Sequence, residues 1–132
     1  GIPTLSGERE RVQPSQIGIL YPALRRQDRS NMNDFLDDLR TIAPVVWFNQ
    51  PGGADIGRPG IKVQTILSSK GLQYKAVIVI WTDLLPFNDD PEQIALDRGQ
   101  LYVAMTRAED LLTVACSSSS AFTEELERTL QT

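Results

Sequence analysis

Apolar and polar positions alternate along this chain in blocks that predict strands and helices in turn. Strand-like aliphatic runs occupy residues 16–21, 45–48, 61–66, 75–81 and 111–116. Helical spacing of apolar residues predicts a helix through residues 33–42 after a cap at Ser30 or Asn31. It predicts further helices from Pro91 to about Arg107 and after a cap at Ser120. Alternation of strands with helices is typical of an α/β sandwich with a mostly parallel sheet. The run at 75–81 is apolar on both faces, as a strand in the middle of such a sheet would be.

Composition narrows the chemistry that this single-domain chain can perform. Its 132 residues contain one cysteine, Cys116, and no histidine, which excludes an internal disulfide, a Ser-His-Asp triad and a histidine-ligated metal. The net charge of −4 speaks against a wholly basic nucleic-acid-binding surface, although a local basic strip remains open. We expect no metal site, no membrane segment and a reducing, cytoplasmic location. The chain opens on Gly1, so we expect it to be a piece of a longer protein.

Two polar joints could carry chemistry, and we expect both at or next to the carboxyl ends of the strands, where open parallel sheets bind ligands. The first, "TILSSKGLQY", offers hydroxyls, a lysine and a glycine, which together suit a phosphate. The second is "LYVAMTRAEDLLTV", where Arg107 follows the end of a helix and could reach a phosphate oxygen. The alternatives are a solvated turn for the first joint and a favourable helix-dipole contact for the second.

Other conspicuous side chains favour structural roles. The acidic pairs Asp37-Asp38 and Asp89-Asp90 are expected on solvated surfaces, while Trp47 and Trp81 stand inside apolar runs and are expected in the core. The ten residues 51–60 include four glycines and two prolines, which predicts a loop.

Taken together, "VQTILSSKGLQYKAVIV" and "LYVAMTRAEDLL" resemble motifs V and VI of the UvrD/Rep-type superfamily 1 helicases, and "ILY" ending at Tyr21 resembles the start of motif IV. The resemblance covers about residues 17–116. It implies a RecA-like (P-loop NTPase-like) three-layer sandwich, the second of the two such domains in the motor. This domain would span residues 16–132 after a polar segment at 1–15. Because the loop at 51–60 is short, the resemblance implies the compact form without a large helical insertion.

The resemblance also implies roles for individual residues. Arg107 resembles the arginine finger, the catalytic residue that reaches the γ-phosphate of ATP. Tyr21, Gly71 and Gln73 would approach the nucleotide together with Arg107. The motif V residues that resemble nucleic-acid contacts are Thr65, Ser68, Ser69 and Lys70.

The partners implied are ATP with Mg²⁺, single-stranded DNA (or RNA), and a first RecA-like domain of the same parent chain that binds most of the ATP. No Walker A or Walker B motif occurs here, so the isolated fragment is expected to be inactive.

Three departures from the family pattern keep alternatives open. Leu67 replaces a histidine, Gln73 replaces a glutamate, and Pro22 replaces an arginine for which Arg25, Arg26 or Arg29 could substitute. These departures favour a degenerate, helicase-derived scaffold without ATPase activity. A plain nucleic-acid-binding domain that uses Lys62, Lys70 and Lys75 is the other alternative.

Overall fold

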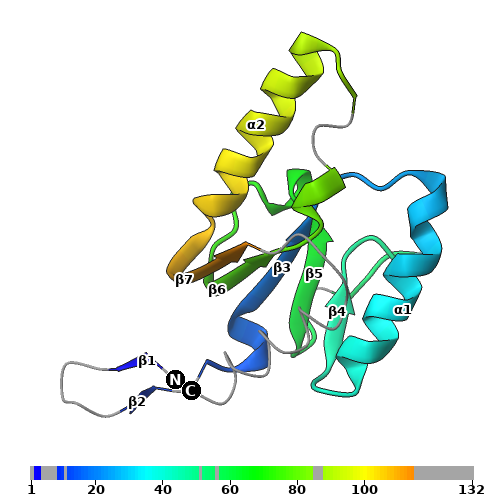
Figure 1. Ribbon diagram of the computed structural model, residues 1–132. Helices are drawn as coiled ribbons and strands as arrows, with labels where there is room; N and C mark the ends of the chain where they lie inside the picture. The colour runs from blue at the N-terminus through cyan, green and yellow to red at the C-terminus, as the bar shows by residue number, and fades with distance from the viewer. Residues whose placement is uncertain are drawn as a thin grey trace.

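Five strands form a sheet in which every neighbouring pair is parallel, in the order β4-β5-β3-β6-β7 (Figure 1). The computed structural model describes residues 2–3, 9–10, 12–50, 52–55, 57–84 and 88–114. The strands are β3 (Ile17–Tyr21), β4 (Val45–Trp47), β5 (Ile61–Thr65), β6 (Tyr74–Val79) and β7 (Ala108–Val114). The predicted α/β sandwich with a mostly parallel sheet is confirmed.

Helix α1 (Arg29–Arg40) packs on one face of this sheet, and the C-terminal end of α2 (Pro91–Met105) packs on the other face, which gives three layers (Figure 1). Helix α1 follows β3, and helix α2 follows β6. Alternate residues of β3 separate the two cores, because Ile17 and Ile19 pack with α1 while Leu20 packs on the α2 side.

Short elements complete the described chain. Strands β1 (Ile2–Pro3) and β2 (Arg9–Glu10) form a separate antiparallel pair. The 3₁₀ turns are η1 (Pro14–Gln16), η2 (Arg26–Asp28), η3 (Leu67–Ser69) and η4 (Thr82–Leu84). Residues 52–55 and 57–60, from the predicted loop, join β4 to β5 through turns and bends.

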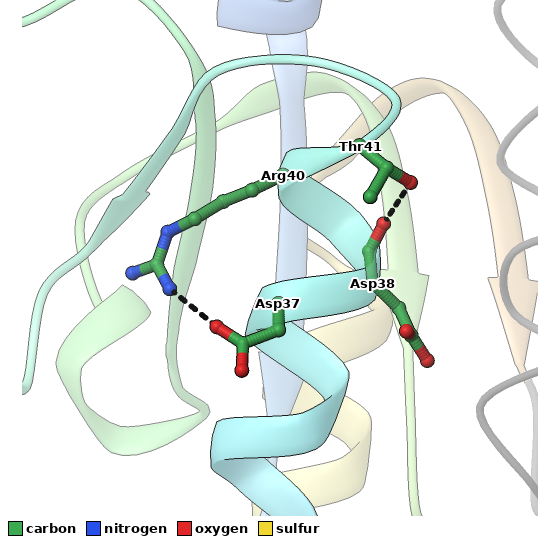
Figure 2. Close-up of polar contacts among 4 residues, drawn as sticks. All are labelled: Asp37, Asp38, Arg40 and Thr41. Carbon is green, nitrogen blue, oxygen red and sulfur yellow. Dashed lines mark hydrogen bonds and ion pairs between the residues drawn. The ribbon is translucent and has the colours of Figure 1, made fainter.

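Helix α1 is amphipathic, as its sequence predicts. Its buried stripe consists of Met32, Phe35, Leu36 and Leu39. On the solvent-exposed face, Arg40 forms an ion pair with Asp37 at 3.3 Å, and the Thr41 hydroxyl donates to the Asp38 carbonyl at 2.6 Å (Figure 2). Asp37 and Asp38 are thus exposed positions of a helix surface.

Helix α2 differs from α1 because its apolar side chains are not confined to one buried face. Asp90 caps its start by accepting from the Glu92 amide at 3.1 Å, with Pro91 in the first turn. Ala104 is fully buried, yet Leu96, Tyr102 and Met105 are 62%, 70% and 44% exposed. A surface helix of a globular protein normally turns a polar face to solvent. Because α2 exposes apolar side chains instead, its surface is suited to further contacts. No helix within the described ranges is long and apolar enough to cross a membrane.

The end of α2 and the start of β7 depart from the sequence prediction. The helix ends at Met105 rather than near Arg107, and β7 begins at Ala108, three residues before the predicted start at 111. Glu109 and Asp110 masked the strand signal, and they are tolerated because β7 is an edge strand and both side chains are exposed. Cys116 and the helix predicted after Ser120 lie outside the described residues.

Candidate functional site

Arg107 lies in the two-residue joint between α2 and β7. Its amide donates to the Ala104 carbonyl at 3.1 Å and so continues the hydrogen bonding of the helix end. Its own carbonyl accepts from the Tyr74 amide at 2.8 Å, which ties the joint to the start of β6. The backbone of Arg107 is therefore fixed on both sides, and its side chain leaves a rigid support.

The Arg107 guanidinium is half-buried and only partly satisfied. Nη1 donates to the Leu72 carbonyl at 3.4 Å, and Nη2 donates to the Thr106 hydroxyl at 3.1 Å. Nε is buried and has no hydrogen-bond partner. Within the described ranges, no carboxylate lies at ion-pair distance from Arg107. An arginine with neutral partners and a spare donor can still bind an anion.

The loop that precedes β6 brings two further candidates beside Arg107. Leu72, whose carbonyl contacts the guanidinium, stands between Gly71 and Gln73. Gly71 has a φ of +82° with open space around the position of a Cβ, and Gln73 is exposed. Gln73 also lines a cavity of about 430 Å³ with Lys75, Glu109 and Asp110. Three of the four predicted ATP-binding residues thus share one place.

This place is the amino edge of the sheet, and the expectation that both joints lie at or next to the carboxyl edge is wrong for Arg107 and for Gly71 to Gln73. A joint that leads from a helix into a parallel strand must lie where that strand begins, and Arg107 immediately precedes β7. The loop after β5 starts at the carboxyl edge but returns to the amino edge before β6 begins at Tyr74.

Tyr21, the fourth predicted ATP-binding residue, is buried in the core at the other end of the sheet. It is 3% exposed, and its ring meets Trp81 edge to face with the centroids 6.2 Å apart. From the start of β6, Tyr21 is roughly 20 Å away along the strands. The structure therefore argues against one nucleotide site shared by Tyr21 and Arg107.

Tyr21 instead organises hydrogen bonds at the carboxyl edge. Its hydroxyl accepts from Trp47 Nε1–H at 3.0 Å and donates to Asn49 Oδ1 at 3.1 Å. Burial raises the pKa of Tyr21 above the ordinary value, against a smaller lowering from the Trp47 hydrogen bond. The phenol consequently stays protonated and keeps both bonds at neutral pH.

Some of the residues predicted to contact nucleic acid are accessible to a ligand, and one is buried. Thr65 ends β5 at the carboxyl edge, and its hydroxyl accepts from the Ser68 amide at 3.3 Å. Ser68 and Lys70 are exposed. Ser69 is fully buried and donates its hydroxyl to the Ile66 carbonyl at 2.5 Å, so it stabilises the η3 turn and has no surface for a ligand.

Sequence reasoning missed a buried polar connection between the two edges. Gln64 is fully buried on the α2 side, and its Nε2 donates to the Tyr74 hydroxyl at 2.7 Å. Tyr74 reaches Gln64 by lying over Gly18, where an added Cβ would stand 2.4 Å from the Tyr74 ring. The signal available in the sequence was a glutamine within the apolar run 61–66.

Exposed apolar side chains lie near the arginine, in the last turn of α2 and in the loop that contacts the guanidinium. Tyr102 lies one helical turn before Thr106, the residue that bonds the Arg107 guanidinium, and Met105 is on the same turn. Leu72 is 38% exposed beside them. We call Leu72, Tyr102 and Met105 the amino-edge apolar patch. In the part of the chain that the structure describes, no group of three or more histidine, cysteine or acidic side chains is placed to hold a metal.

Comparisons with known proteins find two similarities, one to a protein family and one to a solved structure. Residues 61–115, which contain β5 to β7 and Arg107, match the family of the UvrD-like helicase C-terminal domain. Among solved structures, the chain resembles the C-terminal domain of a possible DNA helicase from Lactobacillus plantarum WCFS1, with a TM-score of 0.53 and 19% identity. That match covers 79% of this chain and 57% of the other, and at this identity it shows the fold alone. No curated protein matches the chain. In residues 61–115, the chain is therefore similar to the UvrD-like helicase C-terminal domain.

Proposed function

We propose that this chain is the second RecA-like domain of an ATP-dependent superfamily 1 DNA helicase, with Arg107 as its arginine finger. The observation that carries the proposal is the state of Arg107, a fixed arginine that has no carboxylate partner among the described residues and keeps a buried, unpartnered Nε. An arginine finger needs a rigid backbone and a guanidinium that is not neutralised by a carboxylate, and Arg107 has both within the described residues.

The surroundings of Arg107 fit a partner domain that brings the nucleotide. Gly71 leaves room for close approach of a phosphate or ribose, and Gln73 offers an amide for hydrogen bonding. The amino-edge apolar patch would be buried when a first RecA-like domain docks on this edge. ATP and Mg²⁺ would be held mainly by that domain, where the ion would neutralise phosphate charge.

In this arrangement the chain's own residues complete a site rather than form one. Arg107 would approach the terminal phosphate and stabilise the charge that develops during its transfer to water. Thr65, Ser68 and Lys70 would contact the single strand, while Tyr21 and Ser69 serve the structure. A finger of this kind accelerates hydrolysis by about 10³ to 10⁵, whereas a helix-end arginine contributes under about 1 kcal/mol to stability.

The test is the ATPase activity of the full-length protein, stimulated by single-stranded DNA, with wild type compared with Arg107→Ala. We expect the turnover number to fall by about a thousandfold or more while nucleotide binding is retained. Arg40→Ala is the matched control, because Arg40 is an exposed arginine whose partner is a helix neighbour. Equal activity of wild type and Arg107→Ala would overturn the assignment of the finger.

The scaffold without ATPase activity is the second candidate, favoured by Leu67. This residue replaces the family histidine and exposes 53% of its surface as an apolar side chain. The same experiment separates the two functions, because a scaffold would show no strand-stimulated hydrolysis in the wild type. It would also keep its partner binding when Arg107 is replaced.

A further inference from the structure

We propose that a pocket at the carboxyl edge binds one nucleotide of the single strand, with the base against Trp47 and the phosphate toward Arg29. The inference rests on the proposed function, since it assumes that a strand crosses this domain. It extends the strand-binding surface from Thr65 of motif V to the end of β4 and the start of α1.

The pocket forms where β3, β4 and β5 end. Its volume is about 600 Å³, within the range of sites that hold small organic groups. The lining residues include Trp47 and Asn49 from the end of β4, Thr65 from β5, and Arg29 and Asn33 from α1. In an open parallel sheet, the crevice beyond the carboxyl ends of the strands is the usual place for a ligand.

Trp47 provides the aromatic surface. It is half-buried, whereas Tyr21, the other aromatic residue of the lining, is buried. The bond from Trp47 Nε1–H to the Tyr21 hydroxyl fixes the indole in place. A fixed and partly exposed indole suits stacking on a base of any type, because every base has a π-face.

Amide groups at the mouth of the pocket provide hydrogen bonding. Asn33 and Asn49 are both exposed there. The Tyr21 hydroxyl occupies Asn49 Oδ1 and so orients this amide. The Asn49 Nδ2 donors then remain for the edge of a base, and Asn33 contributes both donors and an acceptor.

The charge around the pocket is opposite to that of the chain as a whole. The chain carries −4, yet residues 25–29 contain Arg25, Arg26 and Arg29 against a single acid, Asp28. Arg29 is exposed and lines the pocket. A polyanionic strand is attracted to such a local positive region, while the acidic remainder of the surface repels it.

The test measures the affinity of the full-length protein for a fluorescently labelled oligothymidine over a range of salt concentrations. We expect Arg29→Gln to lower the slope of log affinity against log salt by about 0.7, the contribution of one phosphate contact in a single strand. At 0.1 M salt this corresponds to about fivefold weaker binding than wild type. Arg40→Gln is the matched control on α1, and we expect it to leave the slope unchanged.

A second variant tests the aromatic contact. We expect Trp47→Leu to weaken oligothymidine binding about tenfold or more, and Trp47→Phe to recover most of the loss. Thermal unfolding of each variant reports whether it folds, and Arg29→Gln, an exposed substitution, keeps the test valid if Trp47→Leu does not.

The outcomes separate this pocket from the ATP site. Unchanged strand affinity and slope in Arg29→Gln would overturn the proposal, even where Arg107→Ala abolishes ATPase activity. A loss of ATP affinity with strand affinity retained would assign the pocket to a free nucleotide and would also overturn it. A failure of the proposed function would appear instead as ATPase activity that is insensitive to Arg107.

Discussion

The two edges of the sheet are built differently. At the amino edge, Arg107 has neutral partners and an apolar patch exposed around it, so the edge resembles half of an interface. At the carboxyl edge, Trp47, Tyr21 and Asn49 are linked by hydrogen bonds, and residues of this chain alone line a pocket. A motor domain that shares its nucleotide with a partner, but holds a strand on its own surface, would need this division.

The largest effect on stability is expected from Gly18→Ala, which strikes the amino edge. The new Cβ would stand 2.4 Å from the Tyr74 ring, and Tyr74 also holds the Arg107 carbonyl through its amide. We expect a loss of about 1–3 kcal/mol in the free energy of unfolding, typical of overpacking. Chemical denaturation measures this loss, and ATPase activity should fall more than strand affinity. Equal losses in both activities would show that the two edges are not independent.

Gly99→Ala is the control for that substitution. Gly99 lies inside α2 with nothing within 4 Å of an added Cβ. Its replacement should stabilise the domain by about 0.5–1 kcal/mol, because alanine loses less backbone freedom in a helix. A destabilisation would indicate that this part of α2 packs against something outside the described residues.

A smaller effect is expected from Gly71→Ala in the loop beside Arg107. Space is open there, but the φ of +82° is strained for a residue with a Cβ. We expect a cost of about 1–2 kcal/mol if the loop keeps its conformation. In the full-length protein the change should weaken ATP binding and spare oligothymidine binding. Calorimetry with a non-hydrolysable ATP analogue measures the first, and a selective loss of strand affinity would contradict the assignment of this loop to the nucleotide.

The smallest expected effect is a loss of stability at alkaline pH, to which one tyrosine at each edge of the sheet contributes. Burial raises the pKa of both Tyr21 and Tyr74 above the unfolded value of about 10. Their contribution to stability is therefore complete below about pH 10 and is lost as the pH rises through the folded pKa values. Denaturation curves at several pH values should show less alkaline destabilisation in Tyr21→Phe and Tyr74→Phe than in wild type.

At neutral pH the two phenylalanine variants should differ from each other. Tyr74→Phe leaves Nε2 of the fully buried Gln64 without its acceptor. Tyr21→Phe affects the exposed Asn49 and the partly exposed Trp47. Tyr74→Phe is therefore expected to be the less stable of the two. The opposite order would mean that Gln64 finds another partner.

The periodicity of apolar residues was sufficient for the layers of the fold. A run that is apolar on both faces, such as 75–81, is typical of a strand in the middle of a covered sheet. The apolar stripe of α1 is typical of a helix that packs on one face of that sheet. The start of the edge strand β7 was harder to predict. Because one side of β7 has no neighbouring strand, the charged residues Glu109 and Asp110 are tolerated near its beginning. A local pattern does not record how many neighbours a strand has.

The sequence names the candidate site residues but does not give their positions in the fold. The strings around Arg107 and Gly71 resemble UvrD-type helicases, and the UvrD-like helicase C-terminal domain model matches the same part of the chain, residues 61–115. They did not reveal that Tyr21 and Ser69 are buried, because burial depends on contacts with distant residues such as Trp81. The roles proposed for Arg107, Gly71, Gln73 and Thr65 stay predictions until the activities are measured.

Gly18, Tyr74 and Gln64 belong to three adjacent strands, and they can change only as a set. A side chain at position 18 requires a smaller residue at 74, and a smaller residue at 74 leaves Nε2 of the buried Gln64 without its acceptor. An apolar residue at 64 would in turn relax the demand on both other positions. Anyone redesigning this domain, or grafting its sheet onto another scaffold, should therefore exchange the three residues together. In an evolving lineage, the same constraint predicts that substitutions at these positions arrive as linked events.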